Sequence, residues 1–240
     1  MRAAFSYFTI LPVGSAEAPR AADLVWLPLV GAVVGALAGG FGALCARVAP
    51  HPLAVVLAYA ALVALTGAIH LDGFLDGCDA LFASVAPERR LEILEDPRHG
   101  TYALAGGIVL AALQLAALAA LPPARLALLL ALSGASARWG AVLQARWAPY
   151  GRAGASARAF ESKPAPLGLA LGALLVAGLA WPLGAGGALA ALVALALASL
   201  CARWSARRLG GVLVGDAYGF AICVAEAGAL VALACLPGRT

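Results

Sequence analysis

Charged residues are scarce in this chain: Asp, Glu, Lys and Arg make up 12% of its 240 residues, whereas 63% are hydrophobic. Soluble domains carry about 25% charged residues, because much of their surface must be polar. A soluble fold of this length would have too little polar sequence to cover its apolar interior. The shortage therefore excludes an ordinary soluble domain and favours a protein whose apolar residues face lipid.

Other features are missing as well. The five cysteines are scattered and form no Cys-x-x-Cys pair, so we expect neither a disulfide framework nor a zinc site. There is no basic stripe with interleaved aromatic residues, which argues against a nucleic-acid partner. We also expect no cleavable signal peptide, because the apolar stretch after Arg2 is short and is broken at Pro12.

Long runs of Ala, Leu, Val and Gly are abundant, and each approaches the roughly 17–25 residues that a membrane-spanning helix needs. In lipid every backbone polar group must be bonded internally, and these runs are too long for barrel strands. We therefore expect an all-α polytopic integral membrane protein with about seven spans, forming a single domain over residues 1–240. The predicted spans are Leu24–Leu44, Leu53–Ile69, Tyr102–Leu121, Leu126–Ala145, Pro166–Trp181, Ala188–Cys201 and Tyr218–Leu236.

Basic and small residues add detail to this layout. Most basic residues precede the first span or lie in the loops after the even-numbered spans, and the other side receives only Arg47, Arg125 and Arg239. By the positive-inside rule, the N-terminus and the loops after even-numbered spans face the cytoplasm. A stripe of small residues in the first span, four residues apart, predicts close packing against another helix: Gly31, Gly35 and Gly39.

Seven of the twelve acidic residues lie between Asp72 and Asp96, in the loop between the second and third spans. Asp72, Asp76 and Asp79 are spaced i, i+4, i+7 and share one face of a helix. Like charges in a poorly solvated place need compensation, and a divalent cation with oxygen ligands is the simplest source of it. Residues 70–101 are therefore the predicted catalytic segment, which either re-enters the membrane or lies on its surface.

A second acidic helix is predicted to end before Pro97, and in it Glu92 and Asp96 are again one turn apart. Glu88, Glu92 and Glu95 also share a face, so the register of the functional pair stays open. Carboxylates without a Cys or multiple-His cluster favour Mg²⁺ over Zn²⁺. The two acidic helices are expected to hold one or two Mg²⁺ ions between them.

Polar residues within or beside the spans are further candidates. Arg138 is expected either to pair with a carboxylate or to bind a phosphate group. Glu226, in the last span, is either its partner or a protonated carboxyl. Asp216 follows a glycine-rich turn, where a ligand can approach the backbone. His70 is either a helix-end residue or a ligand, and Arg152 is either a membrane anchor or a functional group.

These residues resemble the motifs of the cobalamin synthase family, also called adenosylcobinamide-GDP ribazoletransferases. The resemblance rests on two acidic runs, His70-Leu-Asp72-Gly-Phe-Leu-Asp76-Gly-Cys-Asp79-Ala-Leu-Phe and Arg90-Leu-Glu92-Ile-Leu-Glu95-Asp96-Pro-Arg98-His-Gly100-Thr101. It extends over nearly the whole chain, with supporting matches in Phe8–Val13, Pro28–Gly31, Gly210–Asp216 and Glu226.

The resemblance implies the last assembly step of cobalamin biosynthesis. Adenosylcobinamide-GDP and α-ribazole, or its 5′-phosphate, would give adenosylcobalamin, or its phosphate, and GMP. The enzyme would be a Mg²⁺-dependent transferase in the bacterial inner membrane, with its active site facing the cytoplasm and the oligomeric state open, a homo-oligomer included. The implied Mg²⁺ ligands are Asp72, Asp76, Asp79 and Asp96. The implied catalytic residues are Asp79, Glu92 and Asp76, with Asp79 as the first candidate for the proton acceptor and Glu92 as the second. The implied substrate-binding residues are Arg98, Arg138, Thr101, Asp216 and His70.

Two other activities suit the same acidic pattern. A CDP-alcohol phosphotransferase also clusters aspartates at a cytoplasmic membrane face, but its motif is Asp-Gly-x-x-Ala-Arg, and Asp76 follows Phe74-Leu75 here. A cation transporter would place acidic residues near the bilayer midplane. Glu226 and Arg138 alone favour a transporter, because the other acidic residues cluster between spans.

Overall fold

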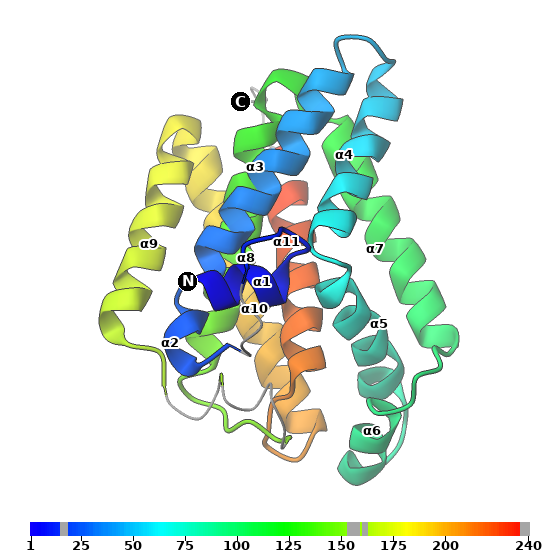
Figure 1. Ribbon diagram of the computed structural model, residues 1–240. Coiled ribbons are helices and arrows are strands. Elements are labelled where there is room, and N and C mark those ends of the chain that lie inside the picture. The colour runs from blue at the N-terminus through cyan, green and yellow to red at the C-terminus, as the bar shows by residue number, and fades with distance from the viewer. Residues whose placement is uncertain (15–18, 153–158, 160–162, 236–240) are drawn as a thin grey trace.

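A computed structural model describes residues 1–14, 19–152, 159 and 163–235 of the chain. The main elements in those ranges are helices, most of them aligned along the long axis of one bundle (Figure 1). They are α1 (Arg2–Phe8), α2 (Ala21–Leu24), α3 (Leu27–Cys45), α4 (His51–Leu65), α5 (Ile69–Phe82), α6 (Pro87–Ile93), α7 (Thr101–Ala119), α8 (Leu126–Gln144), α9 (Pro166–Ala180), α10 (Gly184–Arg208) and α11 (Gly215–Cys235). The all-α prediction is confirmed.

Each predicted span corresponds to a helix, but the boundaries differ and the count of seven is not confirmed. Five helical stretches are long and apolar enough to cross a membrane, or six if α4 and α5 form one broken span. One of them, Pro166–Arg208, contains both α9 and α10, which run in opposite directions (Figure 1). The predicted sixth span was too short, because α10 continues to Arg208. Leu236 and Arg239 lie outside the described residues.

Large aliphatic side chains cover the outer faces of the bundle. On α7, Leu104 and Ile108 are 67% and 62% exposed, and on α9, Leu167 and Leu174 are 72% and 68% exposed. A soluble protein rarely exposes so continuous an apolar surface, whereas lipid solvates it. The chain is therefore an integral membrane protein.

The glycine stripe of the first predicted span packs α3 against α8. A Cβ atom on Gly31, Gly35 or Gly39 would meet a backbone carbonyl of α8 well inside 3.0 Å. The opposing carbonyls belong to Gly134, Leu130 and Leu126, which are themselves four residues apart. The predicted close helix–helix contact is confirmed, and it forms the centre of the bundle.

The acidic helix α5 enters the bundle through a sharp break. Gly67 and Ala68 both adopt positive φ values of 56° and 59°, and α5 leaves the break at 89° to α4. The carbonyl of Leu65, freed at the end of α4, accepts a hydrogen bond from the N–H of Ile10 at 2.9 Å. The Cys223 thiol lies 3.3 Å from the carbonyl of His70. A non-helical segment inside a membrane protein is tolerated where its backbone N–H and C=O groups are hydrogen-bonded to other parts of the protein, as they are here.

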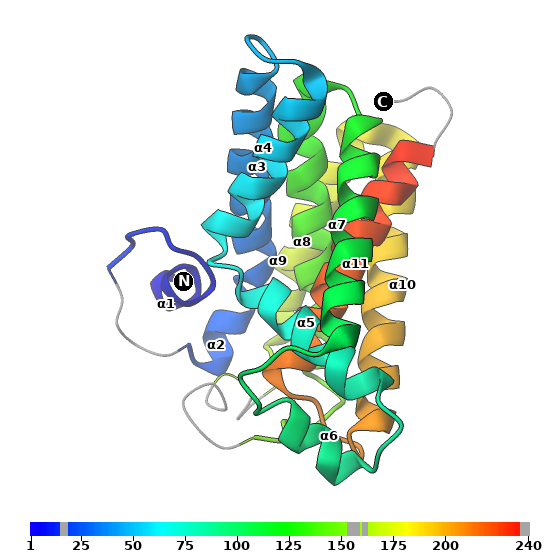
Figure 2. The same cartoon turned by 90° about the vertical axis from the view of Figure 1, so that its right-hand side faces the viewer.

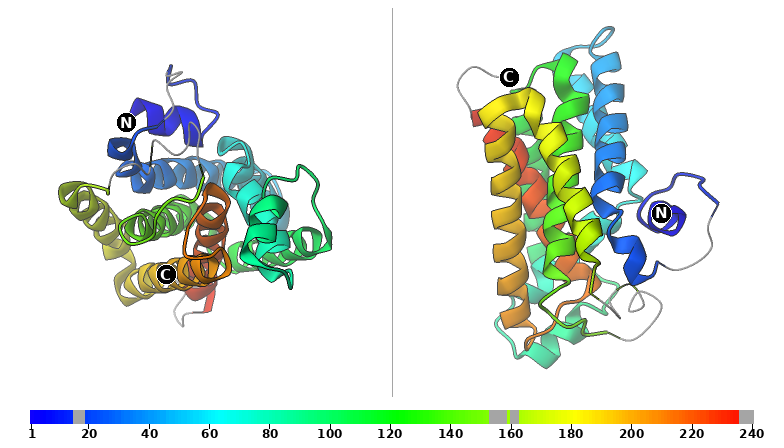
Figure 3. Two further views of the ribbon diagram at one scale, coloured as in Figure 1. Left: turned by 90° about the horizontal axis from the view of Figure 1, so that it is seen from below. Right: turned by 90° about the vertical axis from the view of Figure 1, so that its left-hand side faces the viewer.

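Helix α5 then packs against α7 and α11, and α6 lies beyond it at one end of the molecule (Figure 2). This end, here called the α6 end, also holds α2 and the residues 145–152 and 209–214 (Figure 3). The acidic segment is thus divided between the bundle interior and its end. The end of the predicted second span is corrected: the helix stops at Leu65, because two left-handed residues follow Thr66.

Candidate functional site

Glycine residues let α5 and α11 approach closely at the centre of the candidate site. A Cβ atom on Gly73 would lie 3.0 Å from the Cα of Asp216, and one on Gly219 would lie 3.1 Å from the Cα of Gly73. One turn later, a Cβ on Gly77 would lie 3.0 Å from the Phe220 side chain. The two Asp-Gly pairs of α5 therefore have a double function: the aspartates supply charge, and the glycines admit the neighbouring helix.

Three carboxylates gather at this crossing. Asp72 and Asp76 lie one turn apart on α5, and Asp216 lies in the first turn of α11. Electrostatic interactions link Asp76 with both Asp72 and Asp216. The predicted grouping of Asp72 with Asp76 on one helix face is confirmed, but the third nearby carboxylate comes from α11.

Arg152 supplies positive charge to the cluster. Its Nη1 donates a hydrogen bond to Oδ2 of Asp216 at 2.9 Å, and its Nε lies 3.8 Å from Oε1 of Glu95. His99 lies 3.4 Å from Oδ1 of Asp76. Planar guanidinium groups match the oxygen pairs of carboxylates and phosphates. A cation held at this place compensates part of the carboxylate charge and can also receive a phosphate.

Backbone pairing holds Arg152 in position. The Leu213 N–H donates to the Pro149 carbonyl at 2.9 Å, and the Gly151 N–H donates to the Leu213 carbonyl at 2.8 Å. A Cβ atom on Gly151 would meet the side chain of Val212 at 2.5 Å, so only glycine fits there. The segment after α8 is thereby attached to the turn that precedes Asp216.

Asp79, the predicted base and metal ligand, has other partners. Its Oδ2 accepts the N–H of Gly100 at 2.5 Å, and its Oδ1 accepts the N–H of Ala103 at 3.0 Å. These are unpaired donors in the first turn of α7, which a carboxylate from another helix satisfies here. Thr101, a predicted substrate-binding residue, is the exposed first residue of the same helix.

Two carboxylates of the second acidic patch, Asp96 and Glu92, do not join the cluster of Asp72, Asp76 and Asp216. Both oxygens of Asp96 accept hydrogen bonds from the Arg98 side chain, at 2.8 and 2.7 Å. The hydrogen bonds from Arg98 lower the pKa of Asp96 to about 2. Glu92 pairs with Arg89 at 2.5 Å on the exposed face of α6. Asp96 and Arg98, predicted in separate roles, are therefore each other's partners.

Two arginines fix the far end of α5, a feature that the sequence analysis did not anticipate. Arg90 is 3% exposed and donates to the carbonyls of Ala80 and Leu81 at 2.6 and 3.1 Å. Arg208 donates to the carbonyls of Leu81 and Ala83 at 2.9 and 2.8 Å. These are the unpaired carbonyls at the end of a helix, which cations stabilise.

Arg138 and Glu226 form a pair in the bundle interior. Their side chains lie 3.5 Å apart and are 2% and 6% exposed. The predicted ion pair is confirmed. Both residues and His70 line a small pocket of about 30 Å³, enough space for a water molecule. Arg138 is absent from the lining of the larger cavity described next, so its predicted contact with phosphate stays a prediction.

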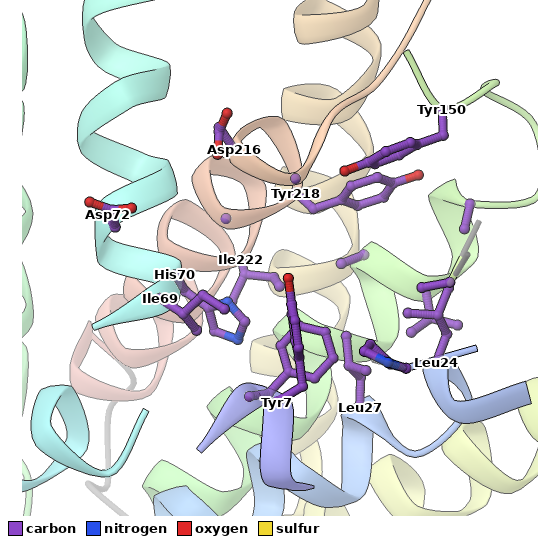
Figure 4. A pocket seen from close by; sticks show the side chains of 18 of the residues that line it. Tyr7, Leu24, Leu27, Ile69, His70, Asp72, Tyr150, Asp216, Tyr218 and Ile222 are labelled. Carbon is purple, nitrogen blue, oxygen red and sulfur yellow. The ribbon is translucent and has the colours of Figure 1, made fainter. Parts of the chain in front are cut away.

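A larger cavity of about 270 Å³ opens beside Asp72 and Asp216 (Figure 4). Arg152 and His70 also line it, together with residues of α1, α2, α3 and α8. Tyr7, Tyr150 and Tyr218 stand around it with their rings facing the interior (Figure 4). The pKa of the Tyr7 phenol is raised by burial and by the neighbouring Tyr150 and Asp216, so this hydroxyl stays protonated at neutral pH.

The described residues include no group of three or more His, Cys, Asp and Glu side chains arranged to hold a metal ion by themselves. The predicted four-aspartate metal site is not assembled, since Asp79 and Asp96 are bonded elsewhere. The donor chemistry of Asp72, Asp76 and Asp216 nevertheless fits Mg²⁺, which commonly takes one or two carboxylates and completes its shell with phosphate and water.

Arg152, for which the sequence left open a role as an anchor or as a functional group, lies at the site. Three further residues of the site, Tyr7, Tyr150 and Tyr218, were not predicted from the sequence. Tyr150 and Arg152 flank Gly151, and Tyr218 follows Asp216 by two residues. Their positions close to Gly151 and Asp216 could have marked both tyrosines as candidate site residues. Tyr7 gave no such signal, because α1 reaches the site only through the tertiary fold.

Comparisons with known proteins place the chain among cobalamin-synthesising enzymes. The model of the cobalamin-5-phosphate synthase family matches residues 1–234. The adenosylcobinamide-GDP ribazoletransferase of Deinococcus radiodurans is 36% identical, over 93% of this chain and 81% of the relative. The proteins of the same name from Leptothrix cholodnii and Halorubrum lacusprofundi are 39% and 38% identical, over 91% and 96% of this chain and 88% and 94% of the relatives. No solved structure matches the chain.

Proposed function

The chain belongs to the cobalamin-5-phosphate synthase family, and we propose that it is an adenosylcobinamide-GDP ribazoletransferase. It joins adenosylcobinamide-GDP to α-ribazole, or to its 5′-phosphate, and releases GMP. The structural observation that supports this most is the cluster of Asp72, Asp76, Asp216 and Arg152 beside a cavity. Phosphoryl transfer requires alignment and charge neutralisation above all, and this cluster can provide both.

The reaction cleaves the phosphoric anhydride of the diphosphate and forms a new phosphate ester. A ribose hydroxyl other than the 5′ one, which carries the phosphate in α-ribazole 5′-phosphate, attacks the phosphorus that is bonded to cobinamide. The bond from this phosphorus to the bridging oxygen breaks, and GMP leaves with that oxygen and its electron pair. The hydroxyl proton passes to a base. No oxidant or further reactant is needed.

The carboxylates orient the reactants. Asp76 and Asp216 would hold Mg²⁺ together with oxygens of the diphosphate, and the bound ion would neutralise charge on the departing GMP. Arg152 is placed to contact a phosphate oxygen while its Nη1 stays on Asp216. Asp79 and Asp96 have both oxygens engaged. Asp72, which lines the cavity, is therefore the residue that we assign to accept the hydroxyl proton.

Neither alternative activity is favoured. The sequence lacks the arginine of the CDP-alcohol phosphotransferase motif after Asp72-Gly73. Arg138 and Glu226, which alone suggested a transporter, contact each other in the interior. A buried pair whose two charges compensate each other has a sufficient structural role in the bundle.

Orientation in the bacterial inner membrane is part of the proposal. The α6 end carries the cluster and most of the described basic residues, whereas the opposite end carries Arg47 and Arg125. This bias supports an active site that faces the cytoplasm, where nucleotide substrates are available. The lipid bilayer is then the partner of the exposed apolar faces of α7 and α9.

The direct test uses purified protein in detergent with adenosylcobinamide-GDP and α-ribazole, with Mg²⁺ or with EDTA. Chromatography follows cobalamin and GMP, which should form in equal amounts and only with Mg²⁺. Asp76→Asn should lower kcat about 100-fold or more, because a charge-stabilising group is lost. Glu88→Gln, an exposed change on α6, is the matched control and should leave turnover unchanged. Absence of product from folded wild-type protein would contradict the proposal.

A further inference from the structure

The cavity beside the carboxylate cluster has two chemically different parts. One part of its lining is polar and charged and includes Asp72, Asp216 and Arg152. Its apolar part is made of aliphatic side chains from five helices, α2, α3, α5, α8 and α11, and of aromatic rings from α1 and α11. The aliphatic part comprises Leu24, Leu27, Ile69, Val142 and Ile222. A ligand that fits this cavity therefore has one flat apolar portion and one polar portion.

The size of the cavity limits its occupant. At about 270 Å³ it is slightly smaller than the usual range of roughly 300–1,000 Å³ for sites that enclose a drug-sized ligand. A corrin macrocycle is much too large to enter. One fused bicyclic ring with part of a sugar is of the right order.

The chemistry of the wall separates the two nucleosides in the reaction. Guanine carries a carbonyl and an amino group on its edge, and burying each of them unpaired costs about 1–3 kcal/mol. Aliphatic residues such as Leu27, Val142 and Ile222 offer them no partner. The base of α-ribazole, a benzimidazole with two methyl groups, has an apolar outer edge that such a wall solvates well.

We propose that this cavity binds the heterocyclic base of the acceptor nucleoside and directs its ribose hydroxyl toward Asp72 and Asp216. This inference rests on the proposed function and identifies the subsite for one of its two substrates. The phosphate-rich donor then lies outside the cavity, on the side of Asp76 and His99. Neither of these two residues lines the cavity. The two substrates approach the carboxylates from different sides, as attack on phosphorus requires.

Helix α1 completes the subsite from outside the bundle. Tyr7 and Phe8 line the cavity, and the ring of Phe8 lies 5.8 Å from that of His70. The N-terminal ammonium contacts Asp23 at 2.8 Å, and the Ile10 N–H bonds to Leu65 at 2.9 Å, so both ends of the helix are attached. The neutral phenol of Tyr7 can donate a hydrogen bond toward a ribose oxygen.

Val142 is the residue that tests the assignment. It is 3% exposed and belongs to the aliphatic wall, contributed by α8. Val142→Phe reduces the space for the base, whereas Val142→Ala enlarges it. Val224→Phe is the matched control, because Val224 lines a separate apolar groove between α5, α7, α10 and α11.

The experiment measures KM for each substrate separately and the equilibrium binding of α-ribazole by dialysis. Val142→Phe should raise KM for α-ribazole about tenfold or more and leave KM for adenosylcobinamide-GDP unchanged. Val142→Ala should reduce the ratio between KM for unsubstituted benzimidazole riboside and KM for α-ribazole. The reason is that the lost contacts are with the methylated edge of the benzimidazole ring. Val224→Phe should change neither constant.

The outcomes separate this inference from the proposed function. A folded Val142→Phe enzyme with unchanged KM for α-ribazole, or with KM raised only for adenosylcobinamide-GDP, overturns the subsite and leaves the transferase activity standing. If wild-type protein shows no turnover, the proposed function fails, and dialysis then decides the subsite by comparing α-ribazole with guanosine. If Val142→Phe does not fold, unchanged base preference in Val142→Ala overturns the inference.

Discussion

At the scale of single residues, the site separates aspartates that the sequence presents as equivalent. Asp72, Asp76 and Asp79 share one helical face, yet only Asp79 has both oxygens bonded to backbone N–H groups of another helix. Spacing along α5 determines which side chains point the same way. It does not determine what each meets, because α7 covers one end of the face and α11 the other.

Asp79 is therefore expected to position α7 and not to take part in chemistry. Asp79→Asn keeps one oxygen acceptor for the first turn of α7, so turnover should fall far less than in Asp76→Asn. Asp79→Ala removes both hydrogen bonds and should lower stability by about 0.5–2 kcal/mol, as losses of helix caps do. Thermal unfolding and kcat measured on the same preparations check both statements. A loss in Asp79→Asn as large as in Asp76→Asn would show that Asp79 is catalytic.

At the scale of helices, glycine positions decide whether the site assembles. Gly73 faces the backbone of Asp216, and its added Cβ would lie 3.0 Å from that Cα. Gly40 on α3 has nothing within 4 Å of its added Cβ. Gly73→Ala should push α11 away, cost about 1–3 kcal/mol and reduce kcat. Gly40→Ala should instead stabilise the protein by about 0.5–1 kcal/mol with normal activity. Equal effects of the two changes on kcat would contradict the assigned role of Gly73.

The break between α4 and α5 gives a prediction about strain. Ala68 is the one described non-glycine residue with positive φ, a conformation that costs an L-residue about 1–2 kcal/mol. Ala68→Gly should relieve it and raise stability by about 0.5–1 kcal/mol, after the greater flexibility of unfolded glycine is included. Ala64→Gly, four residues earlier in α4, is the control and should destabilise by about 1 kcal/mol. Unfolding midpoints measured in one detergent decide the sign.

Helix-forming runs could be predicted from the sequence, but their partners could not. Apolar runs predict helices because lipid requires internal backbone bonding, and the stripe from Gly31 to Gly39 correctly indicated a close contact. The break at Gly67 and Ala68 gave only a weak signal, because alanine favours helix and glycine is abundant throughout the apolar runs. Arg90 and Arg208 looked like ordinary cytoplasmic charges, and only the fold shows them bonded to the end of α5. The position of Arg152 likewise depends on a backbone pairing between distant segments.

At the scale of the whole molecule, the proposed orientation depends on which end of the bundle carries the basic residues. Successive long helices alternate in direction, so the loop after α3 and the loop after α5 lie at opposite ends (Figure 1). The carboxylate cluster and most of the described basic residues share the α6 end. The site can reach its nucleotide substrates only if this end faces the cytoplasm.

Two valines, one in each of these loops, test the orientation. Val48 follows α3 and is 91% exposed, and Val85 follows α5 and is 39% exposed. In a variant without native cysteines, Val48→Cys should react with a membrane-impermeant maleimide added to the outside of spheroplasts. Val85→Cys should react only after the membrane is opened or in inverted vesicles. The opposite pattern would place the cluster outside the cell, away from its nucleotide substrates, and would contradict the proposed cytoplasmic active site. Labelling of both from one side would mean that α4 and α5 do not cross the membrane together.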